Sequence, residues 1–185
     1  MTQLCDEGAL NALINAMQTA PDGQLDRISA LLSDFPEDAR LHLLRGSVLL
    51  GAGRLIEGHQ SLVRAVEISP DFAIARFQLG LFQLTSGEAE NALETWGRLD
   101  RLPEGHYLRH FVEGLRCLIR DDFRNAVKNL REGIRLNQEN PPLSKDMQLL
   151  IDRCIPLIDI ADEDPSSVSE TSFILKQFTT SKTAS

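Results

Sequence analysis

The sequence predicts an all-α protein built as a stack of antiparallel helix hairpins, because three kinds of residue recur at one spacing. Glycines stand 34 residues apart, a small residue follows each glycine by twelve positions, and a large apolar residue follows four positions later. The three sets are Gly46, Gly80 and Gly114; Gly58, Ala92 and Ala126; and Leu62, Trp96 and Leu130. A fixed period of about 34 residues is typical of stacked helical hairpins.

The small residues of this pattern have a packing explanation. We expect each glycine to lie where the first helix of a hairpin crosses the second, with the small residue of the second helix close to it. The large residues are expected to fill the space between successive hairpins. Glycine inside a helix costs about 1 kcal/mol relative to alanine, so three glycines in register indicate close helix packing.

Residues 1–38 are expected to form a degenerate N-terminal hairpin that caps the stack. Apolar residues at helical spacing predict helices over 3–19 and 24–33, separated by the turn sequence Ala-Pro-Asp-Gly at 20–23. Pro36 lies 34 residues before Pro70, so this hairpin ends in phase with the repeats. Asn15 and Gln24 replace the expected aromatic and small residues, as is typical of a terminal repeat.

Three repeats follow, over 39–72, 73–106 and 107–138. Glycine-containing turns at 51–53 and 86–87 separate the helices of the first two repeats, and Asp121-Asp122 takes this place in the third. Proline cannot continue a helix and biases the preceding residue away from helix, so Pro70 and Pro103 mark repeat ends. The predicted helices cover 37–50, 55–68, 72–85, 88–100, 104–120 and 122–136.

The remaining chain is expected to contain one capping helix and a disordered tail. Asn140-Pro141-Pro142 breaks the chain, and Ser144 is the expected N-cap of a helix ending near 160, within a C-terminal capping segment over 139–160. Residues 161–185 are rich in acids and then in Ser and Thr, with few apolar residues to offset the ordering entropy. The apolar segment 173–178 is the exception.

The repeat markers resemble the tetratricopeptide repeat (TPR) family. The second repeat matches that pattern at Leu79, Gly80, Gly87, Ala92 and Trp96. The first repeat matches it at Gly46, Gly53, Leu62, Ala65 and Pro70, and the third at Gly114, Ala126 and Leu130. Departures include Leu49, Gln83 and Cys117 at the usual aromatic position. The resemblance covers 39–138 and implies a TPR-like α-solenoid, a right-handed superhelical stack of hairpins.

The resemblance also implies that the first helix of each repeat lines a concave groove. Arg40 and Ser47 are the polar residues at these positions, and the others are apolar: Leu43 and Leu50; Ile74, Phe77, Leu81 and Leu84; and Leu108, Phe111, Leu115 and Leu118. The Lys, Arg and Asn clamp by which some family members hold a C-terminal carboxylate is missing. The groove is therefore expected to take an apolar partner segment.

This apolar surface has two interpretations. The side chains are either ordinary core, or a docking surface for an amphipathic helix or extended peptide with Phe77 and Phe111 as anchors. A third hypothesis combines the two interpretations: the chain's own segment 173–178 fills the groove until a partner displaces it.

Composition narrows the class of protein. The net charge is −8, and the repeats carry 14 basic against 12 acidic residues, which argues against nucleic-acid binding. No window approaches the roughly 18 apolar residues of a membrane span, and the first residues lack the features of a secretory signal. Three scattered cysteines without a CxxC pair suit a reducing compartment, so a cytoplasmic location is expected.

Signals for catalysis or a cofactor are weak. His106 and His110 have the spacing of two metal ligands on a helix, but no third ligand or HExxH motif accompanies them. We therefore expect no enzyme activity, cofactor or metal, and predict a protein–protein interaction module acting as an adaptor or a chaperone-like escort. The alternative is a structural, self-associating protein whose groove is filled by its own terminal segment, which would make it a homo-oligomer.

Overall fold

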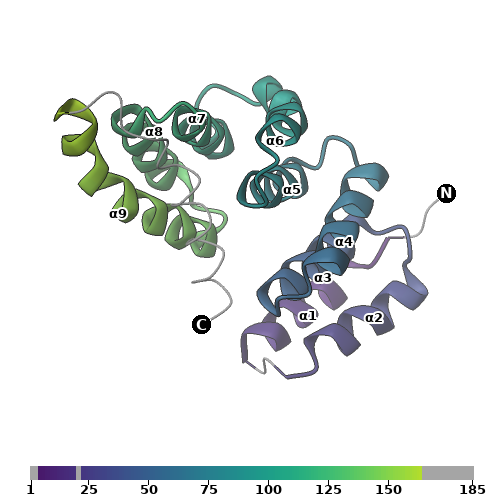
Figure 1. Cartoon of the computed structure of the whole chain (residues 1–185). Coiled ribbons are helices and arrows are strands. Elements are labelled where there is room, and N and C mark those ends of the chain that lie inside the picture. The colour runs from purple at the N-terminus through teal and green to yellow at the C-terminus, as the bar shows by residue number, and fades with distance from the viewer. Residues whose placement is uncertain (1–3, 20–21, 164–185) are drawn as a thin grey trace. The chain divides into compact units, whose positions relative to one another are not determined.

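The computed structural model describes residues 4–19 and 22–163, and over these residues the fold is all-α, with no strand. Figure 1 shows the helices following one another as hairpins. Their bounds are α1 Glu7–Thr19, α2 Gln24–Asp34, α3 Ala39–Gly51, α4 Leu55–Ile68, α5 Ala73–Thr85, α6 Ala89–Trp96, the 3-10 helix η1 Gly97–Arg101, α7 Tyr107–Ile119, α8 Phe123–Leu136 and α9 Pro141–Glu163.

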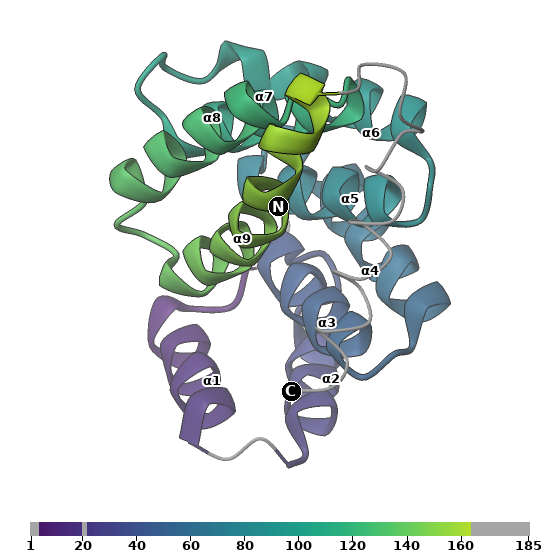
Figure 2. The same cartoon turned by 60° about the vertical axis from the view of Figure 1, so that its left-hand side comes forward.

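The chain forms two compact units, Met1–Leu79 and Gly80–Ser185, whose boundary falls inside α5. In the first unit, α1 packs beside α2, α2 beside α3, and α3 along α4 (Figure 2). An apolar cluster joins the first three helices through Leu10 and Leu13 of α1, Ile28 of α2 and Leu41 of α3. Ile28 lies 34 residues before Leu62 and is fully buried, so the degenerate hairpin keeps the large residue of the repeat pattern.

The second unit contains an irregular hairpin. The helix expected over 88–100 is α only to Trp96 and continues as the 3-10 helix η1. Glycine at position 97 weakens the helix. Pro103 then requires an extended Leu102, whose φ and ψ are −64° and 154°. A tighter 3-10 turn is a common way to end a helix under such constraints.

The last three helices pack in sequence, α7 against α8 and α8 against α9. The C-terminal helix starts at Pro141 rather than after Ser144, because proline at the first helical position gives up an amide that has no partner there. Asn140 is the residue that caps it, since its Oδ1 accepts from the Leu143 amide at 3.2 Å. Pro156 lies within α9, which continues to Glu163. The expected tail segment 173–178 lies outside the described residues.

Left-handed residues turn the chain between the two helices of each repeat. Gly53, Gly87 and Asp121 occur at the 34-residue period and have φ of 74°, 86° and 56°. Glycine adopts this conformation without steric cost, and aspartate is among the few other residues that tolerate it. The third repeat therefore keeps the turn geometry of the other two although its sequence differs.

Each repeat hairpin is closed by a large side chain lying against a glycine. A Cβ on Gly46 would lie 2.9 Å from the Leu62 side chain, and one on Gly114 would lie 2.7 Å from Leu130. A Cβ on Gly80 would be 2.6 Å from Cε2 of Trp96. These three contacts, which we call the glycine notches, lie within a hairpin. The large residues thus fill space inside their own hairpin, whereas the sequence led us to place them between hairpins.

The small residues of the second helices lie close to the same crossings. Gly58 faces Leu50, because a Cβ on Gly58 would be 2.6 Å from Cδ2 of that leucine. Ala92 and Ala126 are fully buried. Among the described residues, no helix combines the length and the apolar character that crossing a membrane requires.

Candidate functional site

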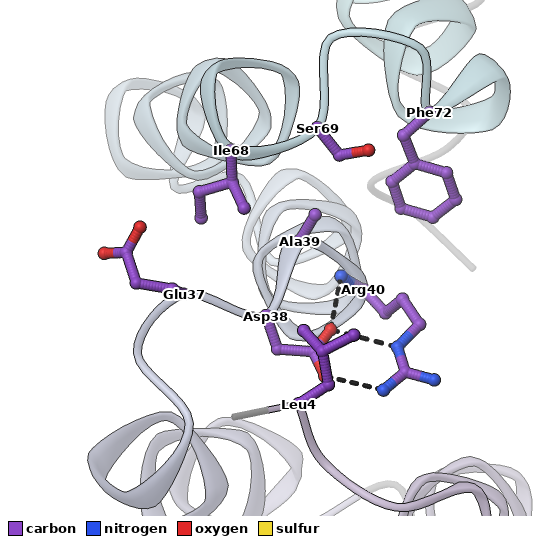
Figure 3. A pocket seen from close by; sticks show the side chains of 8 residues that line it. All are labelled: Leu4, Glu37, Asp38, Ala39, Arg40, Ile68, Ser69 and Phe72. Carbon is purple, nitrogen blue, oxygen red and sulfur yellow. Dashed lines mark hydrogen bonds and ion pairs between the residues drawn. The ribbon is translucent and has the colours of Figure 1, made fainter. Parts of the chain in front are cut away.

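A pocket of about 500 Å³ opens where the N-terminal segment (residues 4–6), the start of α3 and the end of α4 meet. Figure 3 shows Ile68 and Phe72 on one side of it and Leu4, Asp38 and Arg40 on the opposite side. We call it the junction pocket and define it by its lining residues, Leu4, Glu37, Asp38, Ala39, Arg40, Ile68, Ser69 and Phe72. All of them belong to the first unit.

A charged pair, Asp38 and Arg40, lies on the side of this pocket opposite Ile68 and Phe72 (Figure 3). Asp38 is the N-cap of α3, and its side chain accepts from the Arg40 amide at 3.0 Å. The Arg40 guanidinium returns two further hydrogen bonds, from Nε to Oδ1 at 3.0 Å and from Nη2 to Oδ2 at 2.7 Å. The side chain of Asp38 is 1 % exposed and that of Arg40 26 %. This bidentate geometry is the strongest form of an arginine–carboxylate pair.

The same pair holds the N-terminal segment in place. The Cys5 amide donates to Oδ2 of Asp38 at 3.0 Å, and the Cys5 carbonyl accepts from Nη2 of Arg40 at 2.5 Å. Nη1 of Arg40 also pairs with Glu7. Leu4, which forms one wall of the pocket, is the neighbour of the residue held in this way. The junction pocket therefore depends on the Asp38–Arg40 pair for its shape.

The environment of Asp38 favours its ionised form. Burial alone would raise the pKa of this carboxyl, but hydrogen bonds from the side chain and amide of Arg40 and from the amide of Cys5 outweigh burial. The pKa of Asp38 is consequently below its usual range. Burial is the main reason that the pKa of the nearby Cys5 thiol is raised, so this cysteine is protonated at neutral pH.

The expected groove residues of the third repeat are core residues in the structure. Leu108, Phe111, Leu115 and Leu118 are each at most 1 % exposed. Phe111 lies against Gly133 of α8, where a Cβ would be 2.5 Å from its Cε1 atom. A glycine on α8 thus gives the aromatic ring a place inside the hairpin, which corresponds to the core interpretation of these positions.

The second repeat behaves similarly, whereas the first keeps partly exposed side chains. Phe77, Leu81 and Leu84 are buried, with at most 4 % of each exposed. Leu43, Leu50 and Ile74 are half-buried. Leu50 also lies against Gly58 of its own hairpin, and Leu43 and Ile74 are the other two half-buried residues of the expected groove.

The other residues considered for chemistry from the sequence are a pair of histidines and the three cysteines. His106 is the N-cap of α7 and its Nδ1 accepts from the Leu108 amide at 3.2 Å, so it lies outside the helix on which a ligand pair with His110 was considered. Over residues 4–19 and 22–163, no three His, Cys, Asp or Glu side chains are grouped as a metal would require. Cys5, Cys117 and Cys154 are free and buried thiols.

The junction pocket was not predicted from the sequence. Asp38 directly precedes an apolar helix, which is the pattern of an N-cap, and this signal was available. Nothing in the spacing indicated that Cys5 and Glu7 would return to the same point, because their contacts with Asp38 and Arg40 span 33 to 35 residues. Arg40 was assigned to the groove by position, and its neutralisation by Asp38 was not foreseen.

No protein-family model matches the chain. No curated protein matches it significantly.

Proposed function

We propose that the protein is a TPR-like α-solenoid, a right-handed superhelical stack of hairpins, that acts as a non-enzymatic protein–protein interaction module. The observation that carries the proposal is the threefold recurrence of the glycine notches at one period, Gly46 with Leu62, Gly80 with Trp96 and Gly114 with Leu130. Stacked helical repeats present extended surfaces made of equivalent helices, and such surfaces are commonly used for binding.

The partner surface that we propose lies on the first helices of the repeats in the first unit. Leu43 of α3 and Ile74 of α5 are partly exposed apolar side chains at expected groove positions. Fully burying one such side chain against a partner contributes about 1.5–3 kcal/mol. Phe77 and Phe111, the anchors expected from the sequence, are fully buried, so the proposed surface uses neither of them as a direct contact.

The test is capture of a partner from native lysate by the full chain, by the double variant Leu43→Glu/Ile74→Glu and by the control Ile56→Glu. Ile56 is 75 % exposed and lies outside the expected groove, so the control introduces the same chemical change elsewhere. Helical content and Trp96 fluorescence establish that all three proteins are folded. We expect a protein captured by wild type and by the control to be absent with the double variant.

Equal capture by all three proteins would contradict the proposed surface. Sedimentation over a range of concentrations then separates the remaining alternative, a self-associating structural protein, from a binding module. A protein that is monomeric at every concentration and still captures a partner acts through another face. A protein whose size grows with concentration and captures nothing is the structural alternative.

A further inference from the structure

We propose that the junction pocket binds a partner segment in which an apolar side chain is flanked by a lysine or arginine. This inference rests on the proposed interaction function and adds a second contact site with a defined chemistry. It follows from the apolar walls of the pocket, from the ion pairs of Arg40 in its lining and of Arg64 beside it, and from the carboxylates around it, which outnumber these two arginines.

The walls select an apolar side chain. Leu4, Ile68 and Phe72 line a cavity of about 500 Å³, within the range of about 300–1,000 Å³ that is typical of small-molecule pockets in proteins. Leu4 is 57 % exposed although it is a large aliphatic residue. Burial of such surface by a partner removes it from water, which is the main favourable contribution to association.

The cations at the pocket are already neutralised. The guanidinium of Arg40 contacts the carboxylates of Asp38 and Glu7 and the carbonyl of Cys5. Arg64, from α4, pairs with Glu37 of the lining and with Glu67. An anionic ligand would therefore compete with carboxylates already bound to both arginines.

The carboxylates are in surplus and can accept more. Glu7 and Glu37 each use Oε1 in these ion pairs, and a carboxylate has a second oxygen that accepts further hydrogen bonds. Glu7 and Glu37 are 78 % and 44 % exposed, so an approaching ammonium or guanidinium can reach them. Residues 1–38 contain seven acidic residues and one basic residue, which favours a cationic partner at longer range.

The experiment uses two fluorescein-labelled octapeptides, one with a Leu-Phe pair flanked by lysines and one with the same pair flanked by glutamates. Anisotropy titrations with the full chain are expected to give a dissociation constant at least about ten-fold lower for the lysine peptide. Glu37→Lys is expected to remove most of this preference, and Phe72→Ala is expected to weaken the binding of both peptides. The matched control Glu90→Lys changes the same charge at an exposed residue of α6, outside the pocket lining, and is expected to have little effect.

Several outcomes would overturn the inference. One is equal affinity for the two peptides, or no binding of either. Another is an equal loss of the preference for the lysine peptide in Glu37→Lys and Glu90→Lys, which would indicate attraction by net charge without a specific site. A third is a wild-type protein that is dimeric and a Phe72→Ala variant that is monomeric. That result would show that a second copy of the chain occupies the pocket. The proposed function survives any of these if the lysate partner still depends on Leu43 and Ile74.

Discussion

Two regions of the first unit join their helices by different physical means. In the α3–α4 hairpin, the apolar side chain of Leu62 lies so close to Gly46 that a Cβ there would be 2.9 Å from it. At the start of α3, the N-terminal segment is held by the buried carboxylate of Asp38 and the guanidinium of Arg40, which together bind both backbone groups of Cys5.

The difference concerns how each region responds to the loss of one partner. A glycine notch is a match of shapes, so a change costs what the altered packing costs. A buried charged pair is different, because removal of one member leaves the other desolvated and without compensation. The junction should therefore be the more sensitive region to a single substitution, although it lacks the periodic signature of the hairpins.

The largest effect is expected from Arg40→Ala. Asp38, whose side chain is 1 % exposed in the wild type, would lose its guanidinium partner, and Cys5 would lose the donor to its carbonyl. Breaking a buried pair in this way typically costs about 3 kcal/mol or more. Urea unfolding measured at neutral pH gives the difference in free energy of unfolding.

Arg54→Ala is the control for this substitution. Arg54 forms a comparable bidentate pair with Glu57, but both side chains are nearly half exposed. Exposed pairs contribute little to stability because water solvates the separated charges. If the two variants lost equal stability, the distinction between the junction and an ordinary surface pair would be wrong.

The next effect in size is expected from Gly80→Ala, which tests the notches. The new methyl group would collide with the rigid indole of Trp96, which cannot turn aside as a leucine can. Overpacking of this kind costs about 1–3 kcal/mol. Gly51→Ala is the control, because nothing lies near a Cβ there, and alanine should stabilise the end of α3 by up to about 1 kcal/mol. Opposite signs in urea unfolding support the notch, and stabilisation by both substitutions would refute it.

The comparison also explains how far the sequence could be interpreted. The hairpins follow from a repeated pattern, and the bounds of α2, α3, α4, α5 and α8 lie within two residues of the expected ones, because turn glycines and prolines act locally. The break at Trp96 was missed, since its cause is the combination of Gly97 with an early Pro103, and neither residue alone ends a helix at that point.

The candidate site was harder to predict for a physical reason. Whether Phe111 lines a groove or a core depends on the residue opposite, and Gly133 of α8 makes room for the ring inside the hairpin. Position within one helix does not contain this information. The pocket at Asp38 likewise depends on chain segments that meet only after folding, and periodicity cannot indicate such a meeting.

Acid should weaken the junction in a way that identifies Asp38. Its pKa is lowered in the folded protein, so the ionised carboxylate stabilises the fold above the unfolded-state pKa of about 3.9. That stabilisation is lost as the pH falls below this value through the folded-state pKa. Urea midpoints at pH 5 and pH 3 should therefore differ less for Asp38→Asn than for wild type. If Asp38→Asn had the same pH dependence as wild type, other carboxylates would account for the loss of stability in acid.

The smallest effect, a stabilising one, is expected from Asp121→Gly. Asp121 has φ of 56° at the position where Gly53 and Gly87 have 74° and 86°. A left-handed conformation costs a residue with a Cβ roughly 1 kcal/mol, and aspartate recovers part of this by local hydrogen bonding. Glycine removes the steric cost but increases the entropy of the unfolded chain, so the net gain should be about 0.5 kcal/mol. Thermal unfolding would detect it as a small rise in midpoint, whereas a clear fall would show that interactions of the Asp121 side chain outweigh its strained backbone.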